Sequence, residues 1–322
     1  MGRYLIRRSL FLILVLFIVS FLTFLIFFKL PPGDPARLAA GRRTSPDILA
    51  QARENLGLDR PFWVQYWRFA QGLIPGPTWM NEQVYFSYNN FVPVWPQIQQ
   101  RLPYTITLAL GAAGVWLLLG LPIGIVSAIR PRTVWDRAGM LFALFGVSAP
   151  VFWLGYLFLY VFWFKLQMFP GSSIPIDEPI FESIIRGRFV LPWVGLSLTF
   201  AAFYARMVRG NLMETMTEDY IRTARAKGLS ERRVVFKHGL RSALTPVVTM
   251  FGLDLGLLLG GAVITEQVFN IPGIGQYVID ALTTNDFPAV MGVTVFAAFF
   301  IVVANLVVDV AYAFLDPRVR YT

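Results

Sequence analysis

Long runs of apolar residues restrict this chain to structures that place them in a lipid bilayer. Six runs are long enough, at about 10–29, 103–129, 138–164, 189–208, 243–265 and 289–313. A helix of roughly 20 apolar residues crosses a hydrocarbon core of about 30 Å. None of the runs alternates apolar and polar residues as a half-buried strand does. We therefore predict an all-α integral membrane protein with six transmembrane helices.

The composition excludes several classes of function. Only 15% of the 322 residues are charged, too few for a chain that faces water on all sides. The net charge of +9 reflects basic loops, so we expect no nucleic-acid partner. The chain has no cysteine and a single histidine, His238, which leaves no thiol catalyst and no metal site built on these residues. We predict no catalytic residue and no metal ligand.

The distribution of basic residues predicts the topology. Loops rich in arginine and lysine stay in the cytoplasm. Here basic residues gather in 1–8, 130–137, 206–241 and 318–320, whereas the 266–288 loop has none. The 30–101 segment has seven arginines, but long segments cross the membrane largely regardless of their charge. This pattern places both termini in the cytoplasm. The first run is too long for a signal peptide and lacks a small-residue cleavage site, so we expect an uncleaved first helix.

The chain divides into three predicted parts: a first transmembrane helix at 1–29, an external segment at 30–101, and a membrane core at 102–322. Pro31 to Pro35 should end the first helix. Ser45 then has the position of an N-cap and Gly57 that of a C-terminal stop for an external helix. A second external helix is expected over 61–73.

The connection between the fourth and fifth runs predicts a compact cytoplasmic projection over 217–229. Thr217 is expected to cap a short helix whose first turn contains Glu218 and Asp219, which suit the positive end of the helix dipole. Gly228 should end the helix in a left-handed conformation. A second helix starts at Ser230. An ordinary solvated amphipathic helix is the alternative.

The residues of this projection resemble a known family. Arg222 to Leu229, RTARAKGL, resembles the cytoplasmic "EAA" signature of ATP-binding-cassette (ABC) importer permeases, and 219–244 is similar to the dipeptide/oligopeptide (peptide/nickel) branch. Arg222 and Thr223 depart from the general pattern, in which a Glu and an Ala stand there. Further segments stand in family-like order: Pro32 to Pro35, Leu56 to Asp59, Arg101 to Thr105, Pro272 to Gly275, Asn305 to Asp309 and Leu315 to Arg318. The stretch at 76–95 departs most.

The resemblance implies the type I ABC importer permease fold and a heteromeric complex. The expected partners are a second homologous permease, two cytoplasmic ABC ATPase subunits, an extracytoplasmic substrate-binding protein and membrane lipid. The chain has no P-loop motif, so it should hold no cofactor, and the partner ATPases should bind ATP and magnesium. The resemblance also implies peptide transport, although nickel complexes and sugars stay open as substrates.

The candidate site residues form two groups. The ATPase-coupling candidates are Glu218, Asp219, Tyr220, Thr223, Ala224, Arg225, Ala226, Lys227, Gly228 and Leu229. The pore-lining candidates are Asp254, Glu266 and Gln267. An intramembrane carboxylate such as Asp254 usually faces a cavity or a partner, and a structural hydrogen bond is the alternative for it. An ion-gradient-driven secondary transporter is the competing function, although no internal repeat supports it.

Overall fold

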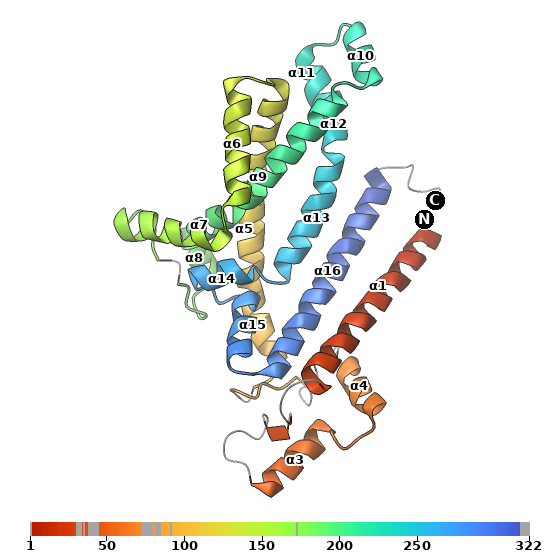
Figure 1. Ribbon diagram of the computed structural model, residues 1–322, viewed down its shortest axis with the longest axis vertical. Coiled ribbons are helices and arrows are strands. Elements are labelled where there is room, and N and C mark those ends of the chain that lie inside the picture. The colour runs from red at the N-terminus through yellow and green to blue at the C-terminus, as the bar shows by residue number, and fades with distance from the viewer. Residues whose placement is uncertain are drawn as a thin grey trace. The chain divides into compact units, whose positions relative to one another are not determined.

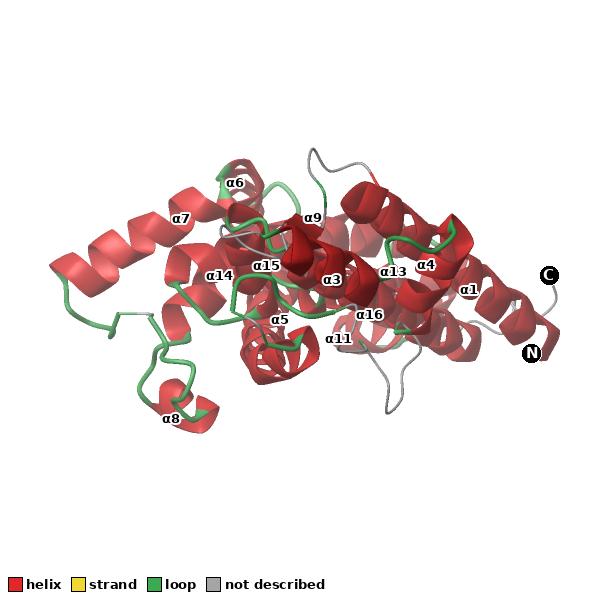
Figure 2. Cartoon of the chain, turned by 90° about the horizontal axis from the view of Figure 1, so that it is seen from below, coloured by secondary structure: helices red, strands yellow, loops and turns green. Residues whose placement is uncertain are grey.

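The computed structural model describes residues 2–29, 34, 36–37, 45–72, 80, 85–90, 92–171 and 173–315. Helices dominate this part of the chain, and one isolated bridge, between Phe86 and Pro93, is its sole pairing of extended backbone (Figure 2). The expected break at Pro31 to Pro35 and the C-terminal arginines lie outside the described residues, apart from Asp34.

Four helical segments in the described part are long and apolar enough to cross a bilayer. They are Ser9–Phe27 within α1 (Gly2–Phe24) and the π-helical turn η1 (Leu25–Lys29), α5 (Val94–Ile129), α9 (Val190–Thr215), and Phe287–Val307 within α16 (Phe287–Leu315). Two bent pairs also pass when each pair is taken as one span: Val134–Ser148 with Val151–Lys165, and Glu231–Ala243 with Thr245–Leu259. The fold is thus all-helical, with four to six apolar segments of spanning length among the described residues.

The third apolar run is broken near its middle. α6 (Val134–Ser148) meets α7 (Val151–Phe158), which continues into a π-helical turn, η2 (Leu159–Lys165), at an angle of 101°. Ala149 is extended, with φ −78° and ψ 124°, because the ring of the following Pro150 disfavours the helical conformation there. The bend therefore lies at Pro150. α5, by contrast, continues through Pro103 and Pro122.

The described residues form two compact units. The first comprises residues 1–105, 256–263 and 272–306, and it has an aromatic core. Phe24 of α1 packs against Tyr66 and Phe69 of α4 (Phe62–Gln71), with ring centroids 5.6 and 5.5 Å away. The Ser20 hydroxyl lies 2.8 Å from the Tyr66 hydroxyl. These contacts hold the second external helix against the first apolar helix.

The first external helix, α3 (Pro46–Leu56), has the predicted ends. The Ser45 hydroxyl accepts a hydrogen bond from the Ile48 amide at 3.3 Å, and Gly57 is left-handed with φ 66°. The Arg53 Nε donates to Asp34 at 3.1 Å. This bond lowers the pKa of Asp34 below its ordinary value. α3 therefore begins and ends where its capping signals predict.

Two polar contacts join the rest of this unit. The amide of Ile274, at the start of α15 (Ile274–Thr283), donates to the Thr105 hydroxyl at 2.9 Å. The Tyr88 amide donates to the buried carboxylate of Asp286 at 3.0 Å, and the Ser87 hydroxyl also bonds to it. The 85–90 turn is thus attached to the residue that precedes α16.

The second unit comprises residues 106–255, 264–271 and 307–322, and its central element is α9. Tyr204, Val208 and Leu212 of α9 are fully buried, and α6, α7 and α12 (Leu240–Ala243) pack against this helix. The Trp193 Nε1 donates to the Thr107 carbonyl of α5 at 3.0 Å. The remaining helices of the described part are α8 (Ile180–Ile185), α10 (Asp219–Ala226), α11 (Glu231–Arg233), the π-helical turn η3 (Val234–Gly239), α13 (Thr245–Leu259) and α14 (Val263–Phe269).

Glycines bring α5 and α9 into close backbone contact. A Cβ atom built at Gly120 would lie 2.8 Å from the Ala201 carbonyl oxygen. At Gly124 it would lie 2.6 Å from the Ala205 carbonyl oxygen. Small residues allow this close packing in membrane helices.

Both predicted cytoplasmic connections of this unit lie at one end. Figure 1 shows α10 and α11 at the end where α5 turns into α6, whereas α7 and α8 lie at the opposite end. The connections at 130–137 and 217–229 are therefore on the same side of the unit.

Candidate functional site

The 217–229 segment contains a short helix, α10, that ends at a left-handed glycine. Gly228 has a φ of 75°. Its amide donates to the Arg225 carbonyl at 2.9 Å, and the Leu229 amide donates to the Ala224 carbonyl at 3.4 Å. The two bonds form a Schellman motif, which satisfies the last carbonyls of the helix and redirects the chain. The predicted glycine stop is confirmed.

A small apolar cluster fixes the direction of α10. Ile221, Ala224 and Val234 are buried together, and the partly buried Met216 and Leu229 pack against them. Burial of a side chain such as Ile or Val stabilises a fold by about 1.5–3 kcal/mol. The cluster therefore packs α10 against the helix that follows it, although few residues take part.

An ion pair bridges the same turn. Arg225 donates to Glu231 from Nε at 3.1 Å and from Nη2 at 2.7 Å. Both side chains are exposed, so the pair contributes about 1 kcal/mol or less. Its two-point geometry nevertheless restrains the angle between α10 and α11.

The outer face of α10 is exposed and polar. The exposed candidates are Glu218, Asp219, Tyr220, Thr223, Arg225, Ala226, Lys227 and Gly228, whereas Ala224 is buried and Leu229 is partly buried.

The prediction that Thr217 caps α10 is wrong. Its hydroxyl donates to the Glu214 carbonyl at 2.7 Å, and Glu218 takes the N-cap position without a side-chain bond. The preceding helix captures Thr217 because its hydroxyl lies within reach of a carbonyl three residues back.

Asp254 on α13 is bonded to α9. The Tyr204 hydroxyl donates to its Oδ2 at 2.7 Å, and Asp254 is only partly buried. Tyr204 and Phe251 lie beside the fully buried Trp116, with ring centroids 6.0 and 5.9 Å from it. In the described part of the chain Trp116 Nε1 has no hydrogen-bond partner. The site thus combines one carboxylate with aromatic rings from three helices.

Glu266 and Gln267 lie on α14, whereas Asp254 lies on α13. Glu266 is fully buried. The Gln267 Nε2 is buried without a hydrogen-bond partner among the described residues. Within the described residues, no three or more potential metal ligands lie together.

One polar contact was missed by the sequence reasoning. Arg209 of α9 donates to Asp136 of α6 from Nε at 2.7 Å and from Nη2 at 2.9 Å. Asp136 also accepts the Arg132 amide at 2.8 Å, and the Thr133 hydroxyl caps α6. The Thr133-x-x-Asp136 spacing is a helix-start signal that could have located the acid, but nothing in the sequence selects its partner.

Comparisons with known proteins show the family to which the chain belongs. Residues 120–321 match the model of binding-protein-dependent transport system inner membrane components, and 1–109 match its N-terminal model. A glutathione transport system permease protein of Salmonella paratyphi A is 39% identical over 322 residues, with both chains fully covered. A dipeptide transport system permease protein of Alkalihalophilus pseudofirmus is 37% identical over 338 residues, covering 99% of each chain.

A solved structure supports the fold. A chain of the inward-facing MetNI methionine ABC transporter matches with a TM-score of 0.53 and 18% identity, covering 69% of this chain and 97% of that one. The family match favours an ABC importer component over an ion-gradient-driven transporter, and in such importers separate subunits hydrolyse ATP. The chain therefore belongs to the inner-membrane permease components of binding-protein-dependent ABC importers.

Proposed function

We propose that the chain forms half of the translocation pathway of a peptide importer. Its partners would be a second homologous permease, two cytoplasmic ATPases that bind ATP and magnesium, and an extracytoplasmic binding protein. The names of the relatives, which refer to glutathione and dipeptide transport, support a small peptide as the substrate. Selection among peptides would rest with the binding protein.

In the proposed topology the chain spans the membrane six times, with both termini in the cytoplasm. The two bent pairs would each form one span. The shared position of the 130–137 and 217–229 connections at one end of the second unit supports this topology (Figure 1). The proposed parts are the first helix at 1–29, the external segment at 30–101 and the permease core at 102–322.

The observation that carries the proposed coupling role is the fixed geometry of the 217–229 segment. The segment presents a polar face to a partner, while its apolar cluster and the Gly228 turn join it to the membrane helices. α12 packs on α9, and the Asn211 Nδ2 donates to the Ala243 carbonyl at 3.3 Å. ATP-driven closure of the ATPases would move α10 and with it α9 and α12. Such a rigid-body movement would switch the pathway between its two openings.

We assign Asp254 to the pathway as the residue that attracts the amino group of a peptide, with Gln267 as a second candidate, whereas the fully buried Glu266 has no surface with which to contact a substrate. An acidic side chain inside the membrane is costly unless it faces water or a partner. The Tyr204 bond leaves the second carboxylate oxygen of Asp254 for a cation, and the neighbouring aromatic rings favour a positive group. Asp254→Asn should reduce uptake of peptides with a free amino terminus more than uptake of N-acetylated peptides. Equal effects on both would refute the assignment.

Photocrosslinking can test the coupling role directly. The chain lacks cysteine, so Ala226→Cys creates a unique attachment point for a thiol-reactive photocrosslinker on the exposed face of α10. In the assembled transporter this position should capture an ATPase subunit. Thr283→Cys, exposed on α15 and predicted to face the outside, is the matched control and should capture none. Capture of an ATPase at Thr283 and not at Ala226 would refute both the topology and the coupling role.

A further inference from the structure

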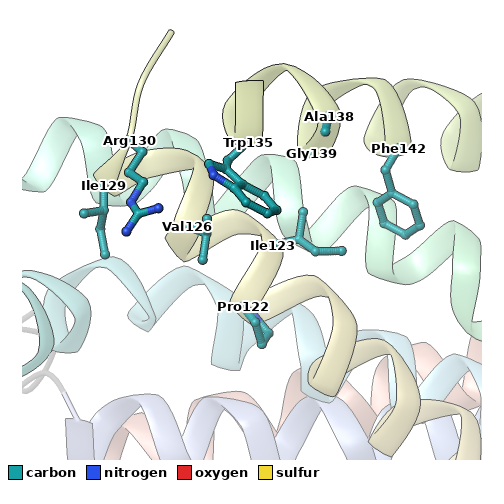
Figure 3. Close-up of a pocket in the computed structure, with 9 residues that line it drawn as sticks. All are labelled: Pro122, Ile123, Val126, Ile129, Arg130, Trp135, Ala138, Gly139 and Phe142. Carbon is teal, nitrogen blue, oxygen red and sulfur yellow. The ribbon is translucent and has the colours of Figure 1, made fainter. Parts of the chain in front are cut away.

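A large groove lies between the end of α5 and the start of α6. It has a volume of about 700 Å³, within the range of about 300–1,000 Å³ that small-molecule sites occupy. Figure 3 shows its lining, which is Pro122, Ile123, Val126, Ile129, Arg130, Trp135, Ala138, Gly139 and Phe142. All but Arg130 present carbon-rich surfaces. The groove is therefore an apolar slot with one cationic side chain.

The charge at this groove is positive and uncompensated. The Arg130 guanidinium has no ion-pair partner in the described part of the chain, and Arg137 is exposed nearby in sequence. The adjacent acid, Asp136, is already bonded to Arg209 and to the Arg132 amide. An anion at Arg130 would thus meet no competing carboxylate from Asp136.

The place of the groove in the chain selects the kind of molecule that would fill it. It lies at the end of an apolar helix of an inner-membrane permease, where lipid is the surrounding medium. Trp135 is 63% exposed at the groove, and tryptophan is enriched where lipid tails meet headgroups. Under the proposed topology this end faces the cytoplasmic leaflet, to which basic clusters are drawn by anionic lipids.

We propose that this groove binds one anionic phospholipid. An acyl chain lies along the slot between Ile123 and Phe142, and the phosphate contacts Arg130. A free phosphate would leave the apolar slot unfilled, and a zwitterionic lipid would satisfy Arg130 less well because its own cation offsets the phosphate. The site is distinct from the coupling segment and from Asp254.

Lipid retention tests the proposal without ATP or substrate, so its outcome does not depend on the proposed transport role. The complete transporter is placed in nanodiscs with equal amounts of phosphatidylglycerol and phosphatidylcholine. It is then extracted, and native mass spectrometry counts the retained lipids. The wild type should retain one phosphatidylglycerol per copy of this chain. Arg130→Gln should lower that retention about fivefold, and Arg130→Lys should largely restore it.

Two further variants separate the charge from the slot. Ala138→Trp should displace the lipid by filling the groove while it leaves Arg130 in place. Arg233→Gln removes an exposed cation from α11 and should change nothing. Equal retention of both lipids by the wild type, or undiminished retention in Arg130→Gln, would overturn the proposal. So would crosslinking of Ala138→Cys to the second permease instead of to lipid.

Discussion

Replacement of Gly228 should separate assembly of the transporter from its coupling. The residue is left-handed, with φ 75°, and no atom lies within 4 Å of a Cβ built on it. A side chain there therefore meets no steric obstacle, and the cost comes from the backbone alone. For an L-residue other than Gly or Asn this cost is about 1–2 kcal/mol.

That cost falls on a weak local structure. The cluster beneath α10 contains three buried residues, so the turn has little free energy in reserve. A loss of about 1–2 kcal/mol lowers the ratio of formed to unformed turn by about 5- to 30-fold. The membrane helices do not depend on this turn, so insertion and complex assembly should persist. We expect uptake to fall in the order Gly228→Asn, Gly228→Ala, Gly228→Val, with the last close to inactive.

The assay is ATP-driven peptide uptake in proteoliposomes, together with quantification of the co-purified ATPase subunits. Gly210 offers a matched control, because an added Cβ also meets nothing within 4 Å there and the residue is helical. Gly210→Ala should transport normally, since alanine favours a helix over glycine by about 1 kcal/mol. Wild-type uptake by Gly228→Val in a stable complex would refute the reasoning, as would equal losses in both variants.

Two further outcomes follow from ion pairs. Asp136→Ala leaves the Arg209 guanidinium, 26% exposed, without its partner, so the free energy of unfolding should fall by about 3 kcal/mol. Thermal unfolding in detergent measures this loss of stability. A double variant with Arg209→Met should recover part of the loss. Equal stability of the wild type and the single variant would contradict the prediction. The pKa of Asp34 is lowered by Arg53, so their bond stabilises the external helix fully above the ordinary pKa of a carboxyl group, and this contribution is lost as the pH falls through the lowered pKa. Hydrogen exchange of α3 should show a small protection difference between wild type and Asp34→Asn at pH 6 that becomes smaller at pH 3. A difference that grows with acid would refute the sign.

The parts of the fold that depend on local chemistry could be predicted from sequence. Ser45, Gly57 and Gly228 act through their own backbone or the next few amides, and the structure places all three as predicted. Four of the six apolar runs coincide with helices of spanning length among the described residues, because the length of each run matches the bilayer, and the runs at 138–164 and 243–265 fall in the two bent pairs. The position of the 101° bend follows from Pro150, but its size depends on what α6 and α7 pack against.

Contacts between distant residues could not be predicted in the same way. The bond from Tyr204 to Asp254 joins residues 50 positions apart, and the bond from Arg209 to Asp136 joins residues 73 apart. Many basic residues could have paired with Asp136, and only the packing of α9 on α6 selects one. Thr217 shows the same limit over a short range. Its hydroxyl could either cap α10 or donate to the carbonyl of Glu214, and the structure has the bond to Glu214.

The glycines at 120 and 124 determine where the second unit can deform. Because the two backbones are this close, sliding of α5 along α9 would bring their atoms into collision. We therefore expect the two helices to move together as one rigid body. We expect movement of the other helices relative to this pair to occur at the bend before Pro150 and at the 47° bend between α12 and α13. Spectroscopic labels placed on either side of those two bends should report motion that a pair of labels on α5 and α9 would miss.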